Sequence, residues 1–385
     1  MIRPAVCGTL GYPRINCKGF HGGAFCCRVP LFQNFRDNPV CPRLDKCGAA
    51  GGRKTKKNTP WESQERNPKY KVFIDDAIHR QGEALLAQKC EIVYGRGFSE
   101  AELMGQTRDV DAIVLVRSGM ATRAIMDNAP RLKVIVKHGV GVDKIDLDAA
   151  DEKGVKVIYT PGLNSISVAE LFVTLALSLL KKMNIGNMAN RKGRWKTEMA
   201  EFFGTELHGK TLGVLGMGKV GWETARICHR GFNMPVIYYD VVPRPQAEAT
   251  FGARPVEIEA LFAEADIISI NIPLDPGTRG LVDARLLRLM KPSAYVINMA
   301  RGEVWREKDV IRALEERWIA GAGSDVYEKE PADPDNPLFK FTNFVGTPHT
   351  AAHTEENMAR TSVAVAEDLI AVLEGREPKF PSPRR

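Results

Sequence analysis

The sequence predicts an α/β protein made of two units, each a doubly wound parallel sheet covered by helices. From Tyr70 onward, short β-branched runs alternate with helical stretches, an order typical of parallel strands joined by helical crossovers. A glycine-rich turn of the form G-x-G-x-x-G separates a strand from a helix in the later half. Because the chain has 385 residues, it is long enough for two such units, and we expect a cleft between them.

The expected strands form two series separated by a long helix. Four strands are expected first, at Lys71–Ile74, Ala112–Val116, Lys133–Val136 and Lys156–Tyr159. Six follow, at Thr211–Leu215, Val236–Tyr239, Ile267–Ile272, Ala294–Ile297, Ala320–Ser324 and Phe344–Gly346. Between the series, Ser167-Val-Ala-Glu170 has the form of a capping box and precedes an apolar run to Leu180. Residues Glu355–Leu373 are expected to form one amphipathic helix.

This pattern predicts three parts of the chain. Residues 1–68 are expected to be a disordered basic leader, because they are rich in Gly, Pro, Asn and Arg and show no hydrophobic period. Residues 69–166 together with 350–385 are expected to form a substrate domain. Residues 167–349 are expected to form a cofactor-binding domain, so that the chain leaves the first domain and later returns to it.

Charge and cysteines are concentrated in the leader. Residues 1–60 hold eleven Lys or Arg and two acids, while the whole chain carries +7, so the remainder is slightly acidic and nucleic-acid binding is not expected there. Six of the eight cysteines also lie in the leader, at spacings that match no zinc motif, and no metal is expected. The apolar stretch Leu171–Leu180 is too short to span a membrane. We expect a cytoplasmic protein, and mitochondrial import through the leader stays open.

The glycine-rich turn carries a signal for dinucleotide binding. Gly216 permits the tight turn, Gly218 lets the backbone approach a pyrophosphate, and Gly221 lets helix and strand pack closely. Asp240 ends the next expected strand, where an acid binds the ribose 2′-hydroxyl and opposes a 2′-phosphate. NAD is therefore expected over NADP, although Arg244 nearby leaves the choice open.

Three polar residues follow expected strands on the carboxyl side of the second sheet, where open α/β sheets bind ligands. These residues are Arg301, Glu330 and His349. An arginine can bind a carboxylate and an adjacent carbonyl together, and a histidine paired with a carboxylate can carry a proton at neutral pH. Taken alone, Arg301 and Glu330 could equally form a solvated ion pair, and His349 could be a capping residue.

Several strings closely resemble the D-isomer-specific 2-hydroxyacid dehydrogenase family. The resemblance covers about Tyr70–Glu374. It is carried by Val116-Arg-Ser118, His138-Gly-Val-Gly-Val-Asp143, Asn164-Ser-Ile-Ser-Val-Ala-Glu170, Gly209–Gly221, Asn271-Ile-Pro-Leu274, Asn298-Met-Ala-Arg-Gly302, Ser324-Asp-Val-Tyr-Glu-Lys-Glu-Pro331 and Thr347-Pro-His349.

The resemblance implies a flavodoxin-like substrate domain, a Rossmann NAD-binding domain and roles for individual residues. Arg301 would bind substrate, Glu330 would pair with the histidine, and His349 would carry the proton. Asp325 would face the nicotinamide amide. The implied cofactor contacts are Gly216, Gly218, Lys219, Val220, Gly221, Asp240, Pro273, Thr278, Ala300 and Asp325. The implied substrate contacts, many through backbone N–H groups, are Arg117, Ser118, Gly119, His138, Gly139, Val140 and Asn164. A homodimer through the NAD-binding domain is also implied.

Departures from the family pattern leave the substrate open. The expected branch is that of the phosphoglycerate dehydrogenases and glyoxylate or hydroxypyruvate reductases, yet the arginines typical of phosphate binding are absent after Trp195. Arg117 and Lys137 could replace them. Formate dehydrogenase is disfavoured because Glu330 is an acid where that enzyme has an amide. Asn271, Trp305 and Arg306 also differ from the usual residues. The alternative function is an NAD-sensing, corepressor-like binding protein on the same fold, and a nucleic-acid binder would depend on the leader alone.

We predict that the leader is dispensable for catalysis, because every motif lies after it. A truncated protein that begins at Asn67 should have a kcat/KM within about twofold of the full chain. Loss of activity in a truncated protein that keeps its circular dichroism spectrum and melting temperature would contradict this prediction.

Overall fold

The structure is a computed structural model that describes residues 69–117, 119–195 and 199–382. The expected leader, residues 1–68, lies outside the described residues, as do Ser118, the segment 196–198 and the last three residues. The prediction of a disordered leader therefore stays a prediction.

The first sheet has five parallel strands in the order β2-β1-β3-β4-β5. Its strands are β1 (Tyr70–Ile74), β2 (Cys90–Tyr94), β3 (Ala112–Leu115), β4 (Val134–Lys137) and β5 (Lys156–Ile158). Four of them match the expected strands within one residue at each end. β2 was not expected: it lies at the edge of the sheet and is half-exposed, so its sequence lacks the continuous apolar run of the inner strands.

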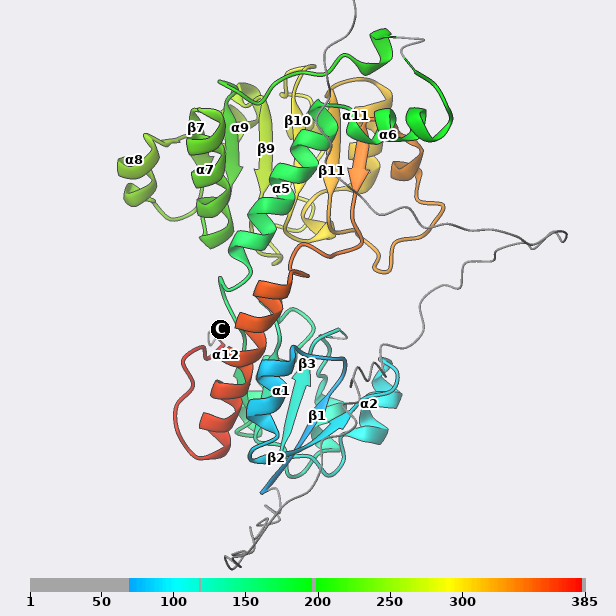
Figure 1. Ribbon diagram of the computed structural model, residues 1–385. Coiled ribbons are helices and arrows are strands. Elements are labelled where there is room, and N and C mark those ends of the chain that lie inside the picture. Colours follow the sequence, from blue (N-terminus) through cyan, green and yellow to red (C-terminus); the bar gives the residue numbers. More distant parts are fainter. Residues whose placement is uncertain (1–68, 118, 196–198, 383–385) are drawn as a thin grey trace, which may run out of the picture. The chain divides into compact units, whose positions relative to one another are not determined.

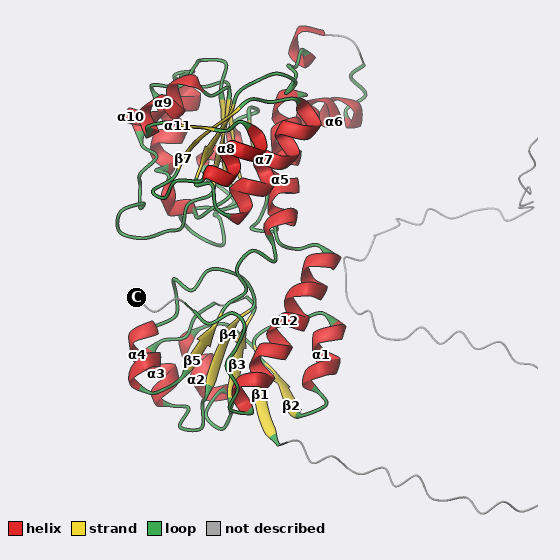
Figure 2. Cartoon of the chain, turned by 90° about the vertical axis from the view of Figure 1, so that its left-hand side faces the viewer, coloured by secondary structure: helices red, strands yellow, loops and turns green. Residues whose placement is uncertain are grey.

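Helices cover both faces of this sheet (Figure 2). On one face lie α1 (Arg80–Leu86) and α12 (Glu355–Leu373), side by side; Leu369 of α12 joins a buried cluster with Val72 and Val134. The other face carries α2 (Glu100–Gln106), α3 (Arg123–Asp127) and α4 (Leu147–Glu152). The expected bounds of α12 are confirmed. The last helix in the chain thus packs on the sheet built from the earliest strands.

The second sheet has seven parallel strands in the order β12-β11-β10-β9-β6-β7-β8. Its strands are β6 (Leu212–Leu215), β7 (Val236–Tyr239), β8 (Arg254–Pro255), β9 (Ile267–Ile270), β10 (Tyr295–Asn298), β11 (Gly321–Ser324) and β12 (Phe344–Gly346). The six expected strands are all present; the two-residue β8 at the edge is too short to leave a periodic signal.

Helices also cover both faces of this sheet. Figure 1 shows the face that carries α5 and α7, which lie in front of the strands in that view. Phe172 of α5 and Ala225 of α7 lie in one buried cluster, and Phe262 of α9 and Val310 of α11 lie in another. The helices are α5 (Ser165–Leu180), α6 (Met183–Arg191), α7 (Lys219–Phe232), α8 (Pro245–Phe251), α9 (Ile258–Glu264), α10 (Ala284–Leu287) and α11 (Glu307–Glu315), with short 3-10 turns at Met199–Phe202, Gly302–Val304 and Pro337–Lys340. The predicted fold class is confirmed, while the exact domain boundaries stay a prediction.

The expected capping box at Ser167 is wrong. Helix α5 begins at Ser165, two residues before Ser167. Its N-cap is Asn164, whose side chain makes no capping hydrogen bond. The Ser167 hydroxyl lies inside the helix and pairs with the Thr354 hydroxyl at 2.9 Å. A Ser-x-x-Glu string therefore occurs here inside a helix, because tertiary contact gives its serine another partner.

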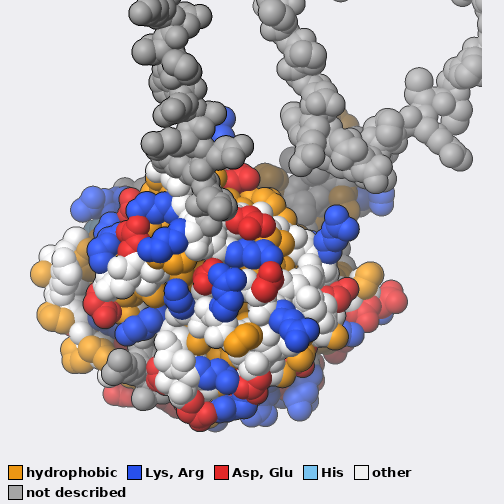
Figure 3. Space-filling model, turned by 90° about the horizontal axis from the view of Figure 1, so that it is seen from below, with side chains coloured by type: hydrophobic (Ala, Val, Ile, Leu, Met, Phe, Trp, Pro, Cys, Tyr) orange, Lys and Arg blue, Asp and Glu red, His pale blue; other side chains and the backbone are white. Residues whose placement is uncertain are grey.

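On the face shown in Figure 3, basic and acidic side chains are interspersed with apolar ones. The described residues form several exposed ion pairs, such as Lys71–Asp109 and Arg123–Glu152. Separately, none of the helices described is long and apolar enough to cross a bilayer.

Candidate active site

Arg301, Glu330 and His349 lie in three loops at one edge of the second sheet. Arg301 follows β10, Glu330 follows β11 and His349 follows β12. These strands are parallel neighbours, so their carboxyl ends meet at the same edge. The sheet order therefore brings together side chains that are far apart in the sequence.

Glu330 and His349 form a hydrogen-bonded pair. Glu330 Oε2 lies 2.8 Å from His349 Nδ1, and the two side chains are 32% and 48% exposed. Burial alone would raise the pKa of Glu330, but the hydrogen bond and charge of His349, the Tyr327 N–H and the Arg301 charge together hold it below its ordinary value. Glu330 is thus ionised at neutral pH. Since a carboxylate only accepts, His349 Nδ1 carries a hydrogen and Nε2 is left to face a substrate.

The loops after β10 and β11 are held together by close backbone contact. A Cβ added to Gly302 would overlap the backbone of Tyr327 and Glu328, so no larger residue fits there. Next to this contact, Glu307 N–H donates to the Glu328 carboxylate at 2.9 Å, and Glu328 N–H donates to the Glu307 carboxylate at 2.7 Å. This reciprocal pair fixes the Arg301 loop relative to the Glu330 loop.

The Arg301 guanidinium is partly buried and oriented by three neighbours. Its Nη1 donates to the Ala300 carbonyl at 2.8 Å, and its Nε lies 3.4 Å from an oxygen of Asp143. Gly141 approaches so closely that an added Cβ would overlap Arg301 Nη2. Asp143 lies on one side of the Arg301 guanidinium. The N–H groups that remain on the guanidinium can bind a carboxylate or a carbonyl oxygen.

A second cation, Lys137 at the end of β4, lies close to the loops predicted to bind substrate. Its Nζ donates to the Val116 carbonyl at 3.0 Å and lies 3.4 Å from the position of a Cβ on Gly119. Burial, opposed by Asp75 and assisted by Arg301, lowers the pKa of Lys137 to about 8. Lys137 and Arg301 thus repel each other, and an anion bound between them would relieve this repulsion.

The other side chains in this region have partners inside the protein. The Arg117 guanidinium stacks 4.7 Å from the Phe98 ring centroid and faces Asp76 at 3.8 Å. The backbone N–H groups of Val116 and Arg117 both donate to the buried Asp75 carboxylate. Asp75 therefore fixes the path of the chain just before Ser118, which itself lies outside the described residues.

Two of the expected backbone donors have partners within the protein. His138 N–H donates to the Leu115 carbonyl and Gly139 N–H to the Lys137 carbonyl, both at 2.9 Å, so neither is directed at a substrate. The buried His138 ring pairs with the Ser362 hydroxyl at 2.8 Å, and burial lowers its pKa to about 4, so it is neutral. His138 N–H continues the pairing of β4 with β3, whereas Gly139 N–H closes a tight turn onto Lys137, so both N–H groups shape the loop.

Val140 and Asn164 have polar groups that fit a ligand better. No hydrogen bond within the described residues engages the Val140 N–H, and the Val140 residue is 40% exposed. The Asn164 Oδ1 atom is buried without a partner in that same part of the chain. A buried amide oxygen without a donor is costly, which favours a bound group or water next to it.

The dinucleotide turn has the geometry that its three glycines predicted. Gly216 has a φ of +92°, and Gly221 packs against the Gly216 carbonyl, where a Cβ would overlap. Gly218 caps α7, and a Cβ added there would meet no atom within 4 Å among the described residues. The open side of Gly218 and the start of α7 are therefore suited to a diphosphate. Lys219 is currently bonded to the Pro161 carbonyl at 3.0 Å, and Val220 packs against the apolar cluster behind the turn.

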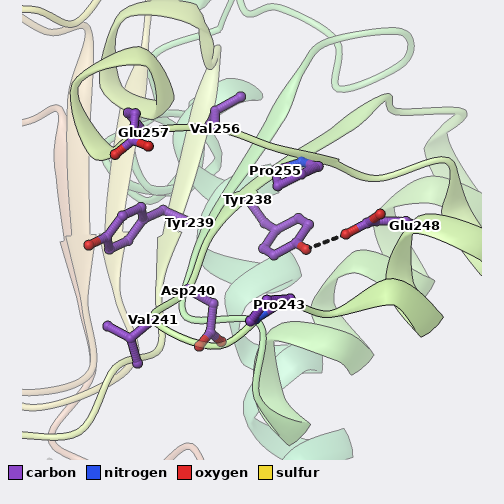
Figure 4. A pocket seen from close by; sticks show the side chains of 9 residues that line it. All are labelled: Tyr238, Tyr239, Asp240, Val241, Pro243, Glu248, Pro255, Val256 and Glu257. Atoms are coloured by element: carbon purple, nitrogen blue, oxygen red, sulfur yellow. Dashed lines mark hydrogen bonds between the residues drawn. The ribbon is translucent and has the colours of Figure 1, made fainter.

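Asp240 lies at the carboxyl end of β7 and lines a pocket of about 520 Å³ (Figure 4). Its carboxylate accepts from Met217 N–H at 2.9 Å and Val242 N–H at 3.0 Å, and pairs with Arg244 at 3.1 Å. Asp240 is thus tied to the glycine turn. The pocket is also lined by Tyr238, Tyr239, Val241, Pro243, Glu248, Pro255, Val256 and Glu257. Rings and aliphatic side chains beside a carboxylate suit an adenosine group.

The remaining expected cofactor contacts lie after β9, β10 and β11. The Thr278 hydroxyl donates to the Pro273 carbonyl at 2.7 Å, which closes the loop after β9. Ala300 is buried and its N–H donates to the Asn298 amide oxygen at 3.0 Å. Asp325 is buried and its carboxylate faces the backbone of the His349 loop. Among the described residues, no cluster of three or more His, Cys, Asp or Glu side chains is arranged to hold a metal ion.

Four residues of this site have contacts that were not expected from the sequence. Asp75 accepts from the loop backbone at Val116, and Thr347 donates to the Asp325 carboxylate. Gly141 makes room for Arg301, and Asp143 pairs with it. Gly141 and Asp143 belong to the string His138–Asp143 that carried the resemblance, so that string contained a signal for them. Asp75 follows β1 directly and so had a positional signal as well, because carboxyl ends of strands face the site.

Comparisons with known proteins support the resemblance. A family model described as "D-isomer specific 2-hydroxyacid dehydrogenase, NAD binding domain" matches residues 173–351. Glyoxylate reductase of Thermofilum pendens is 37% identical over 315 residues, 80% of this chain and 93% of that protein. D-3-phosphoglycerate dehydrogenase of Methanocaldococcus jannaschii is 38% identical over 307 residues, 79% of this chain and 58% of that protein. The structure of an NADPH-dependent glyoxylate/hydroxypyruvate reductase from Sinorhizobium meliloti with NADP and malonate matches 82% of this chain and 99% of its own, with 27% identity and a TM-score of 0.73.

We predict that Gly141→Ala displaces Arg301, because the added methyl group would overlap the guanidinium. The expected result is a loss of roughly 100-fold in kcat/KM for a keto acid, the scale of a misplacement of about 1 Å. Gly105→Ala is the matched control, since a Cβ there meets nothing within 4 Å and alanine suits helix α2. Equal kcat/KM values for the two variants would contradict this prediction, because Arg301 would then not depend on the space beside Gly141.

Proposed function

We propose that this chain, which belongs to the D-isomer-specific 2-hydroxyacid dehydrogenases and is a nicotinamide-dependent oxidoreductase, works through Arg301, Glu330 and His349. The reaction is the interconversion of a small 2-keto acid and its D-2-hydroxy acid. The observation that carries the proposal is the 2.8 Å pair of Glu330 and His349, at the same sheet edge as Arg301. An acid–base pair and a carboxylate-binding cation are the groups that this chemistry requires.

The residues divide the reaction among them. Arg301 binds the substrate carboxylate and draws electron density toward the keto oxygen. A bound nicotinamide would supply the chemistry of hydride transfer to and from C2 of the substrate. As the carbonyl π electrons move onto oxygen, that oxygen takes the proton from His349 Nε2. In the reverse direction, neutral His349 takes the hydroxyl proton.

Glu330 sets the charge and the orientation of His349. Its carboxylate accepts from Nδ1, which leaves Nε2 facing the substrate, and it stabilises the imidazolium that donates the proton. A neutral partner could orient the ring equally well but would not favour its positive charge. The two effects can therefore be separated by Glu330→Gln.

The proposed substrate carries a second anionic or strongly polar group. Lys137 supports this, because it presents an ammonium beside Gly119 and repels Arg301. The Val140 N–H and the unpartnered Asn164 amide oxygen are further proposed contacts. Arg117 and Gly119 stay candidates from the family resemblance, with Arg117 available only if it leaves Phe98. A phosphate or a terminal hydroxyl next to the keto acid would suit this surrounding.

The proposed cofactor is NAD. A ribose diol could replace the two Arg244 hydrogen bonds to Asp240, whereas a 2′-phosphate would be repelled by that buried carboxylate. The steady-state ratio of kcat/KM for NADH and NADPH tests this. A preference for NADPH would show that Arg244 turns to the phosphate and outweighs Asp240.

A second copy of the chain is the proposed partner. Among the described residues between Met183 and Phe203, four large apolar side chains are at least 47% exposed: Met183, Met188, Trp195 and Phe203. This segment belongs to the proposed NAD-binding domain, as the expected homodimer requires. Light scattering should give twice the chain mass, and Trp195→Glu should shift it toward the monomer. A monomeric wild-type protein would refute the dimer.

One experiment tests the function most directly. Purified protein is given NADH with glyoxylate, hydroxypyruvate or 3-phosphohydroxypyruvate, and NADH loss is followed. Saturable turnover of any of these keto acids supports the proposed enzyme activity. Their kcat/KM values then show which second substituent on the keto acid the site prefers. NADH binding without turnover of any of the three favours the corepressor-like alternative.

We predict distinct effects for the acid–base pair. His349→Ala should lower kcat for keto-acid reduction by roughly 100-fold or more. Glu330→Gln should keep the ring orientation but remove the charge that favours the imidazolium, so activity should fall off at a lower pH than in wild type. The pH profile of kcat checks this, with the NADH dissociation constant as control. If the alkaline limb does not move, Glu330 does not act on His349.

We predict that substrate affinity depends on the Lys137 charge. Because its pKa is lowered to about 8, Lys137 loses its proton as the pH rises through about 8, whereas a solvent-exposed lysine stays charged there. KM for an anionic keto acid should therefore rise between pH 7 and 9. Lys137→Arg should keep KM flat over this range, since arginine stays charged. A KM that rises equally in both proteins would assign the effect to another group.

A further inference from the structure

Asp325 directly follows β11, and its carboxylate accepts hydrogen bonds from residues on both sides of His349. Its Oδ1 accepts from the Thr347 hydroxyl at 2.7 Å and from Thr350 N–H at 2.8 Å. Its Oδ2 accepts from Ala351 N–H at 2.9 Å. The Asp325 carbonyl also accepts from His349 N–H at 2.8 Å. Four hydrogen bonds from one buried residue thus end in the five-residue stretch 347–351.

His349 needs such a restraint because of its backbone conformation. Its φ is +55°, in the left-handed region that non-glycine residues seldom adopt. Such a residue keeps this conformation only when its surroundings impose it. The imidazole is 48% exposed, and its hydrogen bond goes to Glu330, so packing alone does not fix the ring. The backbone of the loop must therefore set the position of the ring.

We propose that Asp325 and Thr347 are positioning residues that hold the 347–351 loop and thereby set the Glu330–His349 pair. The proposal rests on the proposed function, because it concerns how His349 is placed for proton transfer. Asp325 acts through the loop backbone and Thr347 acts through Asp325. We call the four hydrogen bonds between Asp325 and residues 347–351 the clamp. The Thr347 hydroxyl is the single side-chain donor among them, so its removal is the smallest change that weakens the clamp.

A carboxylate is the group that this arrangement needs. It accepts from three donors at once, and it carries no hydrogen of its own when ionised. An asparagine would keep one acceptor oxygen but would turn an NH₂ group toward either the Ala351 or the Thr350 N–H. A buried donor facing a buried donor leaves both without partners, which is costly. The clamp therefore depends on the charge of Asp325 as well as on its shape.

The clamp makes a different prediction from a direct cofactor contact. If Asp325 acts mainly on the nicotinamide amide, as the family resemblance implies, weakening its surroundings should reduce NADH affinity. If it holds the His349 loop, NADH affinity should stay the same while proton transfer suffers. The alkaline limb of the pH profile should also move, because a displaced ring loses the Glu330 charge.

The test uses the full-length protein and the variants Thr347→Val, Thr347→Ser and Thr174→Val. Valine has the shape of threonine but no hydroxyl. Thr347→Val should lower kcat for keto-acid reduction by about tenfold or more, the direction expected for a misplaced proton donor. Its alkaline limb should move to lower pH, with the NADH dissociation constant unchanged. Thr347→Ser should restore both properties. Thr174→Val is the control, since Thr174 is exposed and its hydroxyl donates to the Glu170 carbonyl within α5.

Hydrogen exchange provides a second measurement that does not depend on turnover. In Thr347→Val, the amides of the peptide spanning residues 347–351 should exchange faster than in wild type, while peptides of β10 and β11 should not change. If Thr347→Val does not fold, Thr347→Ala, which leaves space instead of a methyl group, carries the same expectation.

The outcomes separate the two proposals. If wild type turns over none of the keto acids with NADH, the proposed function fails; exchange in the 347–351 peptide still tests the clamp. If wild type is active and Thr347→Val keeps its kcat, pH limb and exchange rates, the clamp is refuted and the proposed function stands. Loss of NADH affinity in Thr347→Val would refute the clamp in favour of a cofactor role.

Discussion

The approach of Gly302 to the backbone of Tyr327 and Glu328 is the constraint on which the rest of the site depends. Parallel strands bring the ends of β10, β11 and β12 to one edge, but strand order alone does not fix loops to within an ångström. Direct backbone contact does so, because it leaves no side chain that could adopt another rotamer. The reciprocal hydrogen bonds of Glu307 and Glu328 add a second link between the same two loops.

Burial divides the ionisable groups near the site into three kinds. His138 is buried with a neutral hydroxyl partner, so its ring is uncharged and serves packing. Glu330 is partly buried but receives hydrogen bonds and positive charge, so it stays ionised. Lys137 lies between these cases, because burial opposes its charge while Asp75 supports it. Burial opposes the charge of all three groups, and the partners of each group decide how far that effect is offset.

The fold could be predicted largely from the sequence, because apolar periodicity marks inner strands and long helices. What escaped were elements without that signal: the half-exposed edge strand Cys90–Tyr94 and the start of α5. In the site, motifs identified Arg301, Glu330 and His349, which follow buried strands. Motifs did not reveal that His138 and Gly139 spend their N–H groups within the protein. For His138 this depends on pairing with Leu115 at the end of β3, which is a property of two segments together, and for Gly139 it depends on the tight turn onto Lys137.

The sheet that carries each group has a consequence for how proteins of this kind diversify. The Glu330–His349 pair lies on loops of the seven-stranded sheet, whereas Lys137 ends β4 of the five-stranded sheet and Val140 lies in the loop that follows. If Lys137 and Val140 contact the substrate as proposed, substitutions there are expected to change which acid is accepted without altering the Glu330–His349 pair. Gly141 is the exception, since its lack of a side chain is needed by Arg301. Substrate range in such a lineage is expected to drift through residues around this glycine, with the glycine itself held constant.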